Sequence, residues 1–369
     1  MRANFEPLGE VAYKATGYKM INSIDIKRFR GFEKAHVGNC ARVNLVVGEN
    51  GVGKTAFLES IFLAAGGSPE VAIRMRNWRG LGEGPIQGTP EQVDEAIWRD
   101  MFHDFRKSLN ISISLKGDAS NSRSVTISWN DQPTSIPISS SADSNTKAIA
   151  PVSFKWTDSN GHDFLVRPTI ENGQLKMNST PRRPAETFFF PANHSYSAIE
   201  TAGRFSSLSR ISAESDVVDL FKEHFPRIES LSVEVLAASA MLYAKVADIP
   251  EKMPLNLMGS GMSKLASILF AIPEHKKSVV LIDELENGLY YKRLHQVWLA
   301  LHSFATKYDT QIFVTTHSAE CLNAASKVAE IYPSDFSVIQ VGQKTGAATL
   351  RQFAGDKFVD AMKEDIEIR

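Results

Sequence analysis

Residues 48–55 have the types and spacing of a loop that binds phosphate groups, Gly-x-x-x-x-Gly-Lys-Thr. Its glycines let the backbone curl so that successive N–H groups face one anionic centre, and the helix expected after the loop adds its positive end. In such a loop the lysine reaches the β- and γ-phosphates and the hydroxyl binds Mg²⁺. The pattern predicts a nucleotide site formed by Asn50, Gly51, Gly53, Lys54 and Thr55, with Thr55 also a ligand of the metal ion.

Two adjacent acids end a second apolar segment, Val279–Ile282. A buried strand of this kind would hold Asp283 toward the metal ion, and Glu284 would act as the general base on the attacking water. A strand that ends in two acids is a weak signal alone, because many strands end in solvated acids. Together with the phosphate loop it predicts Asp283 as a metal ligand and Glu284 as a catalytic residue.

A histidine, His317, follows a third apolar segment at residues 311–316 and precedes Ser318. A lone histidine is more often structural than chemical, and a helix-capping role is the alternative here. The carboxyl ends of parallel strands, however, gather at one edge of a sheet, where ligands bind in open α/β folds. We therefore expect His317 to lie with the phosphate loop and Asp283 and to sense the γ-phosphate as a third catalytic residue, beside Glu284 and Lys54.

The residues Gly259, Ser260 and Gly261 stand at the start of an expected helix. Backbone N–H groups and a serine hydroxyl at such a position can face an anion. Taken alone, the same pattern is typical of an ordinary capped helix.

Strands that alternate with helices must position these residues. Segments 42–47, 278–283 and 311–316 are mostly apolar, as strands buried on both faces should be, and helical stripes lie between them. This predicts an α/β fold with a mostly parallel central sheet. Within residues 109–183, short segments of period two separated by polar links predict an antiparallel meander, with a hairpin turn at Asn172-Gly173.

We divide the chain into four parts on these patterns: a leader at 1–19, an N-terminal lobe at 20–67 with the phosphate loop, an inserted helical and antiparallel β region at 68–186, and a C-terminal lobe at 187–369. Residues 89–92, Thr-Pro-Glu-Gln, look like a capping box that opens a helix in the inserted region. The inserted region shows no heptads, which argues against a long coiled-coil arm.

Composition excludes several classes of protein. The 369 residues carry a formal net charge of −1, which excludes a wholesale nucleic-acid coat but not a local basic patch. No apolar run is long enough for a membrane-spanning helix, and the start of the chain lacks a signal peptide's apolar region. Its two cysteines cannot form a disulfide framework. We expect a cytoplasmic protein that makes no membrane contact.

Together, and in this order, these segments resemble ABC-type ATPases of the SMC, RecF and OLD (overcoming-lysogenization-defect) group. The likeness is greatest to the OLD-like AAA ATPase subunits of bacterial anti-phage systems of the Gabija and PARIS type. It covers the chain from about residue 20 to the end, apart from the inserted region. It is carried by residues 26–32 (IKRFRGF), 43–61 (VNLVVGENGVGKTAFLESI), 254–265 (PLNLMGSGMSKL), 281–289 (LIDELENGL) and 311–322 (QIFVTTHSAECL).

The resemblance implies a P-loop NTPase head of the ABC/SMC type in which two heads enclose two Mg-ATP molecules. Gly259, Ser260 and Gly261 of one head would then contact the nucleotide of the other. Glu284 would be the hydrolytic base, and residues 287–289 would couple the two sites. Arg28 and Arg30 fall where the family often contacts nucleotide, but solvated surface arginines fit the sequence nearly as well.

Three departures from the family are visible. The signature motif, residues 259–262, reads Gly-Ser-Gly-Met, and Tyr290 replaces a common histidine. The glutamine that normally links the metal ion to the head is not identifiable, and Gln87 and Gln92 are only guesses.

The leading functional hypothesis is an ATP-hydrolysing switch that dimerises, or forms a higher homo-oligomer, around Mg-ATP. It would control a partner effector in anti-phage defence. The segment after His317 is too short for the Toprim nuclease domain of many OLD proteins, so any DNA cleavage is expected to reside in a partner. The alternatives are a RecF-like repair ATPase that binds DNA directly and a scaffold in which ATP only holds two chains together. GTP is not expected, because no Asn-Lys-x-Asp sequence follows a strand.

Overall fold

The computed structural model describes residues 21–81, 89–117, 122–130, 148–171, 174–177, 187–194, 197–274, 277–344, 346–364 and 366–368. The expected leader at 1–19, Gln87 and the expected turn at Asn172-Gly173 lie outside these residues. None of the helices among the described residues is both long enough and apolar enough to cross a membrane.

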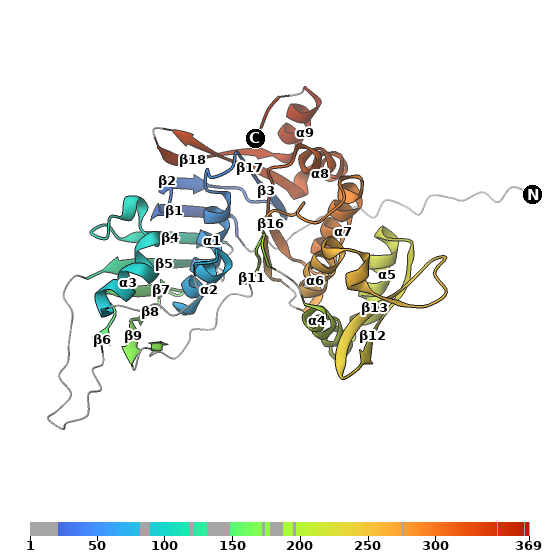
Figure 1. Ribbon diagram of the computed structural model, residues 1–369. Coiled ribbons are helices and arrows are strands. Elements are labelled where there is room, and N and C mark those ends of the chain that lie inside the picture. Colours follow the sequence, from blue (N-terminus) through green and yellow to red (C-terminus); the bar gives the residue numbers. More distant parts are fainter. Residues whose placement is uncertain are drawn as a thin grey trace, which may run out of the picture.

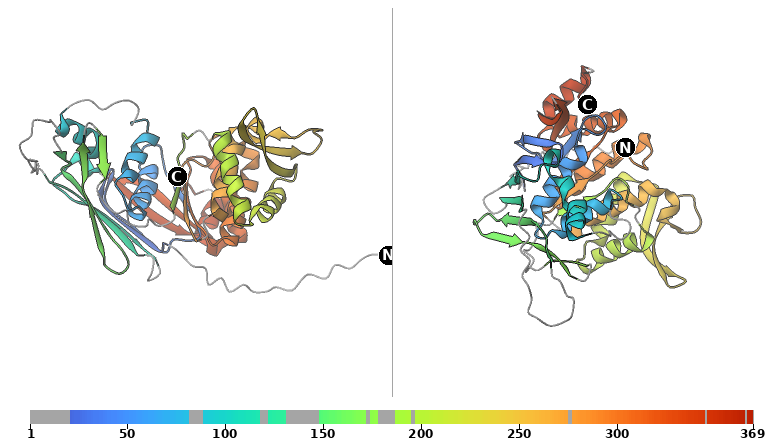
Figure 2. Two further views of the ribbon diagram at one scale, coloured as in Figure 1. Left: turned by 90° about the horizontal axis from the view of Figure 1, so that it is seen from below. Right: turned by 60° about the vertical axis from the view of Figure 1, so that its left-hand side comes forward.

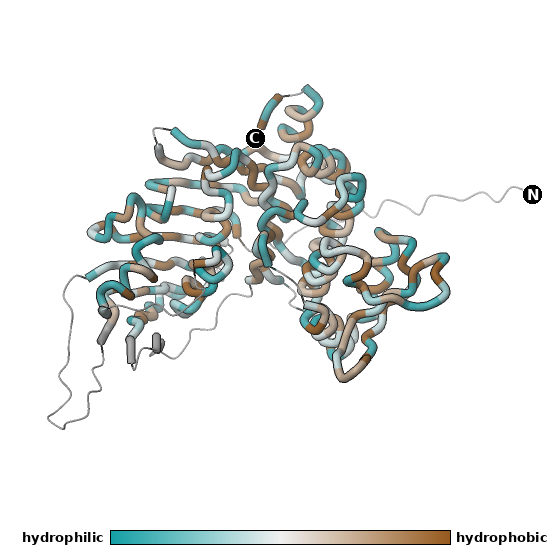
Figure 3. Tube along the Cα trace, in the orientation of Figure 1, coloured by the Kyte–Doolittle hydropathy of each residue, from teal (hydrophilic) through white to brown (hydrophobic). Residues whose placement is uncertain are grey.

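A six-stranded sheet forms the centre of the molecule (Figure 1). Its strands, in spatial order, are β11 (Thr187–Phe190), β15 (Val279–Ile282), β16 (Gln311–Thr315), β3 (Val43–Val47), β17 (Phe336–Lys344) and β18 (Ala347–Ala354). All neighbours pair in parallel except β17 and β18, which are antiparallel. The expected mostly parallel sheet is therefore confirmed. Strands β3, β15 and β16 are mostly apolar and buried along their whole length, and Figure 3 shows brown segments gathered in this region.

A second six-stranded sheet is antiparallel throughout. Its strands, in spatial order, are β2 (Phe32–Val37), β1 (Ser23–Phe29), β4 (Ile111–Lys116), β5 (Arg123–Trp129), β7 (Val152–Thr157) and β8 (Asp163–Val166). The expected meander is thus present, and its first strand, β4, pairs with β1 from before the phosphate loop. A small sheet adjoins it, with β10 (Gln174–Met177), β9 (Pro168–Glu171) and β6 (Ala148–Ile149).

Helix α1 (Lys54–Ala65) lies between the two large sheets (Figure 2). It contacts β4 and β5 on one side and β11, β15 and β16 on the other. All its residues except Thr55 are buried, because apolar sheets cover it on both sides. The Trp156 Nε1–H donates to the Leu63 carbonyl at 3.1 Å and ties the antiparallel sheet to this helix. The helix that follows the phosphate loop is therefore fixed on two sides.

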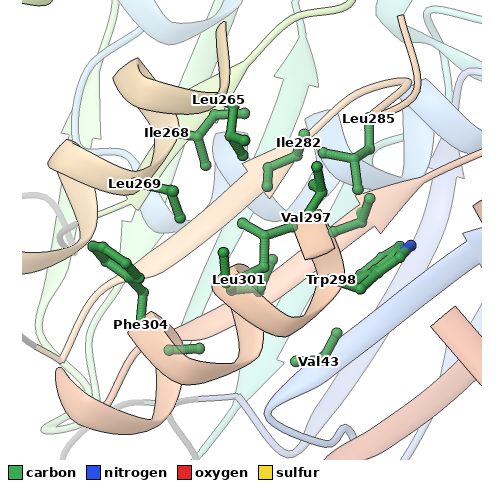
Figure 4. Close-up of a cluster of buried hydrophobic side chains, with 14 of the residues drawn as sticks. Val43, Leu265, Ile268, Leu269, Ile282, Leu285, Val297, Trp298, Leu301 and Phe304 are labelled. Carbon is green, nitrogen blue, oxygen red and sulfur yellow. The ribbon is translucent and has the colours of Figure 1, made fainter. Parts of the chain in front are cut away.

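Three helices cover the opposite face of the central sheet: α6 (Ser260–Glu274), α7 (Leu294–Lys307) and α8 (Ala319–Ile331). Leu265, Ile268 and Leu269 of α6 pack with Val297, Trp298 and Leu301 of α7 over Val43 and Ile282 (Figure 4). This cluster and the cluster around α1 form the two halves of the core, one on each face of the sheet. Because both faces are packed, the strand ends are rigidly placed.

The remaining elements lie around these layers. Helices α2 (Glu70–Trp78) and α3 (Pro90–Trp98) lie beside the antiparallel sheet (Figure 1). Helix α3 begins with the expected capping box of Thr89 and Gln92. Beyond α6 lie α4 (Ala198–Arg210), α5 (Glu214–His224) and the sheet β12 (Ile228–Leu236), β13 (Ser239–Val246) and β14 (Met253–Pro254) (Figure 1). Helix α9 (Gly355–Lys363) packs on α8. The short 3₁₀ helices are η1 (Arg99–Met101), η2 (His103–Phe105), η3 (Leu255–Met258), η4 (Tyr291–Arg293) and η5 (Pro333–Asp335).

Candidate nucleotide site

The phosphate loop joins the end of β3 to the start of α1. Gly48, Gly51 and Gly53 all have positive φ, at 145°, 80° and 115°. A side chain at Gly48 would place its Cβ 2.2 Å from the Val341 carbonyl oxygen, so only glycine fits there. Asn50 and Gly51 are exposed at the tip of the loop. The geometry is that of a curled backbone cradle, as the motif predicts.

The start of α1 is arranged to receive an anion. Its N-cap residue, Gly53, provides no side-chain cap, and no acidic residue lies in the first turn. The first N–H groups of a helix need partners from outside the helix, and a phosphate oxygen suits them. The Lys54 amine donates to the carbonyls of Gly48 and Glu49, both at 2.8 Å, so it lies over the same loop. Burial lowers the pKa of Lys54, and Glu284, Asp283 and Glu286 oppose that effect.

The expected metal ligands meet. The Thr55 hydroxyl donates to the Asp283 carboxylate, 3.1 Å from either oxygen. Burial raises the pKa of Asp283, whereas hydrogen bonds from Thr315 and Thr55 favour its charged form. No group of three or more His, Cys, Asp or Glu side chains among the described residues could hold a metal ion. A hydroxyl and one carboxylate do fit Mg²⁺ that is also bound by phosphate oxygens and water, the usual manner of Mg²⁺ at nucleotide sites.

The segment after β15 turns sharply at Glu284, whose φ is 47°. The Glu284 N–H donates to the Thr315 hydroxyl at 2.8 Å, and its Oε2 accepts from Asn287 Nδ2 at 2.7 Å. His317 Nδ1 lies 3.9 Å from Glu284 Oε1. The structure therefore brings Glu284 and His317 together, as the strand ends predict.

Glu286 is a residue of this site that the sequence reasoning did not single out. Its Oε1 accepts the backbone N–H groups of His317 and Ser318, at 2.9 and 3.2 Å, and lies 3.3 Å from His317 Nδ1. Its Oε2 is buried without a hydrogen-bond partner among the described residues. Glu286 thus fixes the loop that carries His317. The available signal was a third carboxylate close behind Asp283-Glu284, but nothing in the sequence shows which loop it contacts.

Ser260 and Gly261 lie at the start of α6, against a different part of the site. A Cβ at Gly261 would be 2.1 Å from the Gly288 carbonyl oxygen, so the helix start and the 287–288 turn are in close contact. A pocket of about 340 Å³ lies beside them and is lined by Ala192, His194, Asn256, Ser260, Ser263, Lys264, Asn287 and Gly288. No residue of the 48–55 loop lines this pocket. Within one chain, therefore, the described contacts of Ser260 and Gly261 are not with the phosphate loop.

The arginines Arg28 and Arg30 have different environments. Arg28 is exposed, whereas the Arg30 side chain is only 10% exposed and pairs with Glu59 of α1 at 2.9 Å. Arg79 shares the same carboxylate through two bonds of 2.8 Å. Arg30 is therefore part of a buried ion cluster behind α1, not a solvated surface residue.

Gln92, one of the two guesses for the linking glutamine, takes part in the capping box of α3. Its side chain accepts from the Thr89 N–H there. The strand next to β15 is β11, and the Asp283 N–H donates to the carbonyl of its last residue, Phe190, at 2.9 Å. Tyr290 is exposed and packs edge-on against Tyr291.

Comparisons with known proteins agree with this geometry. The profile of the family described as "AAA domain, putative AbiEii toxin, Type IV TA system" matches residues 43–323. A protein of Helicobacter pylori (strain ATCC 700392 / 26695) named "ATP/GTP phosphatase" is 22% identical over 354 residues, covering 86% of this chain and 90% of that protein.

Solved structures of SMC heads are similar in fold. An SmcHead bound to the C-winged helix domain of ScpA matches with a TM-score of 0.51 and 15% identity, over 91% of this chain and 99% of that chain. An SMC head from Pyrococcus furiosus with an extended coiled coil, bound to the C-terminal domain of ScpA, has a TM-score of 0.48, 13% identity and coverage of 94% and 99%. With its phosphate loop and the acids of β15 inside the matched residues, this chain belongs to the AAA-domain family so described and is an ATPase with an SMC head-like fold.

Proposed function

We propose that this chain works as a nucleotide-driven switch: two copies close around two Mg-ATP molecules, and hydrolysis releases them. The loop amides and Lys54 would bind the phosphates, and Thr55 and Asp283 would hold Mg²⁺. The observation that carries the proposal is the meeting of Thr55, Asp283 and Glu284 at one edge of the sheet. P-loop hydrolysis requires those three roles within one site.

Each side chain has a task in this proposal. The Glu284 carboxylate is held by Asn287 and takes a proton from the attacking water. His317, fixed through Glu286, donates from its ring toward the γ-phosphate. Mg²⁺, when bound, neutralises charge on the transferred phosphoryl group. Lys54 supplies a second positive charge to the same group.

The dimer is proposed from the place of Ser260. It is exposed at the N-terminus of α6, a position suited to an anion, yet the residues around it belong to the 287–288 turn and the neighbouring pocket. A nucleotide held by a second chain would give this surface an anion to bind. The family resemblance places the signature motif of one head on the nucleotide of the other, which supports the same arrangement.

The biological role that we propose is control of a partner effector, a nuclease, in anti-phage defence in the cytoplasm. The support is the resemblance to OLD-like subunits of the Gabija and PARIS type and the toxin named in the family description. The similar SmcHead is bound to a domain of ScpA, so a head of this fold can carry a protein partner. We propose that effector docking here depends on the nucleotide state.

Mass measurement tests the switch. Light scattering of the purified chain with Mg-ATP should show twice the monomer mass or a higher multiple, and Lys54→Ala should stay at the lower mass under the same conditions. A mass that does not respond to Mg-ATP would contradict the switch. Binding of duplex DNA by the chain alone, dependent on ATP and weakened by salt, would instead support the repair ATPase.

A further inference from the structure

Helix α6 contacts the segment that carries Glu284 at two points, one helical turn apart. At its start, Gly261 lies against Gly288 so closely that no Cβ fits between them. One turn after Ser260, the Lys264 amine donates to the Glu284 carbonyl at 2.7 Å and lies 3.4 Å from the Asp283 carbonyl. The surface proposed to meet a second chain and the proposed base are therefore joined within one protomer by a single turn of helix.

Lys264 is an unusual residue for this place. It is only 5% exposed and lies on a helix whose other residues from 261 to 273 are all buried. Burying an ammonium group costs free energy unless partners compensate, and here burial lowers the pKa of Lys264 while Glu286, Asp283 and Glu284 oppose that effect. An apolar residue would fit the helix better. A role in the site explains the lysine.

The backbone of Glu284 is in a conformation that needs support. Its φ of 47° lies in the left-handed region, which costs a non-glycine residue free energy unless its surroundings fix it. Four hydrogen bonds do so: its N–H donates to Thr315, its side chain accepts from Asn287 Nδ2, and its carbonyl accepts from both the Asn287 N–H and the Lys264 amine. Of these bonds, only the one from Lys264 comes from α6.

We propose that Lys264 is a positioning residue that couples the Ser260 surface of each chain to Glu284 of the same chain. A nucleotide that engages the start of α6 from a second chain would shift or stiffen this turn, and Lys264 would carry the change to the Glu284 carbonyl. Hydrolysis in each site would then depend on whether that chain's own α6 is engaged. The inference rests on the proposed dimeric switch and deepens it.

The coupling role differs from simple structural support in what it predicts. Lys264 has no described contact with residues 48–55, so nucleotide binding to the phosphate loop should not depend on it. Its removal should act on the rate of hydrolysis and on the response to the Ser260 surface. A structural lysine would affect stability and all steps together.

The test uses Lys264→Met in the full chain, with Lys327→Met, an exposed lysine of α8, as the matched control. We measure the Kd for a fluorescent ATP analogue with Mg²⁺, kcat and KM for ATP hydrolysis, and the unfolding midpoint. For Lys264→Met we expect kcat to fall at least about tenfold with Kd within about twofold of wild type. Lys264→Arg, which keeps a donor, should recover at least about threefold in kcat over Lys264→Met.

A double-mutant cycle with Ser260→Ala completes the test, because the effects of substitutions at two coupled residues do not add. If Lys264 connects Ser260 to Glu284, adding Ser260→Ala to Lys264→Met should lower kcat by less than about twofold, whereas Ser260→Ala alone should lower it at least about fivefold. Additive losses, an unchanged kcat in Lys264→Met, or a loss confined to Kd would overturn the proposal. Failure of wild type to hydrolyse ATP or change mass would instead overturn the proposed switch.

Discussion

The Thr315 hydroxyl donates to Asp283 Oδ1 at 2.7 Å and at the same time accepts the N–H of Glu284 at 2.8 Å. One side chain at the end of β16 thus fixes both acids at the end of β15. This bond also favours the charged form of Asp283, against the burial that raises the pKa of its carboxyl group. The proposed metal ligand and the proposed base are therefore oriented by a neighbouring strand.

Thr315→Val should weaken the response to Mg²⁺. Without the hydroxyl, Asp283 loses a hydrogen bond that opposes the effect of burial, so its pKa rises further. Its carboxylate also loses a donor that orients it. Changes of this kind next to a metal ligand lower metal affinity about 10- to 100-fold. The Mg²⁺ concentration for half-maximal ATPase should therefore rise at least about tenfold. Thr315→Ser keeps the hydroxyl and serves as the control. Equal Mg²⁺ dependence in the valine variant and wild type would contradict the role of this bond.

Lys54→Ala and Glu284→Gln should separate binding from hydrolysis. Loss of the Lys54 charge should weaken Mg-ATP binding about 10- to 100-fold, as charge-assisted hydrogen bonds contribute about 1.5–3 kcal/mol. Glu284→Gln keeps an oxygen that can accept from Asn287 but cannot take a proton, so hydrolysis should fall at least about 100-fold. Titration with a fluorescent ATP analogue and Mg²⁺ measures the loss of binding, and phosphate release measures the loss of hydrolysis.

The Glu284→Gln variant should bind ATP normally and remain in the higher-mass state. Phosphate release at the wild-type rate would show that Glu284 is not the base. A variant that loses hydrolysis but no longer changes mass would favour a role in assembly.

The sequence predicts the site best where chemistry follows a strand directly. Lys54 and Thr55 begin α1, and only the phosphate loop separates them from β3. Asp283 is the residue directly after β15. Apolar strands buried on both faces are visible in the sequence, and parallel strands bring their carboxyl ends to one edge. For these reasons the central sheet and the meeting of Thr55 with Asp283 could be predicted.

Contacts that strand order alone does not set could not be predicted in this way. The bonds of Glu286 to the His317 loop and of Lys264 to Glu284 depend on how helices pack on the sheet. The same holds for β1, whose pairing with β4 crosses the phosphate loop and α1. Strand β11 has no alternation that marks it, yet it borders β15. Tertiary packing decides such contacts, and local patterns do not report it.

Gly261→Ala should disrupt the contact between α6 and the 287–288 turn. The new Cβ would lie 2.1 Å from the Gly288 carbonyl oxygen, so one of the two segments must move. We expect a lower unfolding midpoint and at least about a tenfold loss of ATPase. Gly203→Ala is the matched control: it lies in α4 with nothing within 4 Å of the added Cβ, and alanine should stabilise that helix by about 0.5–1 kcal/mol.

Glu59→Gln should destabilise the fold strongly. Glu59 is buried on α1 and pairs with Arg30 and Arg79, so its neutralisation removes the ion-pair partner of the largely buried Arg30 guanidinium. Loss of one partner of a buried pair costs about 3–5 kcal/mol. Glu95→Gln, which removes an exposed pair with Lys107, should cost less than about 1 kcal/mol. Urea unfolding of both variants measures the difference, and similar values would contradict the buried cluster.

Asp94→Asn should stabilise the protein, and more so at higher pH. Burial raises the pKa of Asp94 to about 6, from an ordinary value of 3.8, although the hydrogen bond from Trp98 Nε1 opposes this effect. The folded state therefore holds this proton more tightly than the unfolded state, and stability falls as the pH rises from about 4 through about 6. Above that range the wild type carries a buried charge, which the asparagine lacks.

The asparagine can still accept the hydrogen bond from Trp98, so the change mainly removes that charge. Between pH 4.5 and 8 we expect the stability advantage of Asp94→Asn over wild type to grow by on the order of 1–2 kcal/mol, since each pKa unit corresponds to about 1.4 kcal/mol. Asp219→Asn, at an exposed position of α5, should show no such growth. Urea unfolding at the two pH values decides the matter: an advantage that stays constant with pH would mean that Asp94 titrates normally in the folded protein.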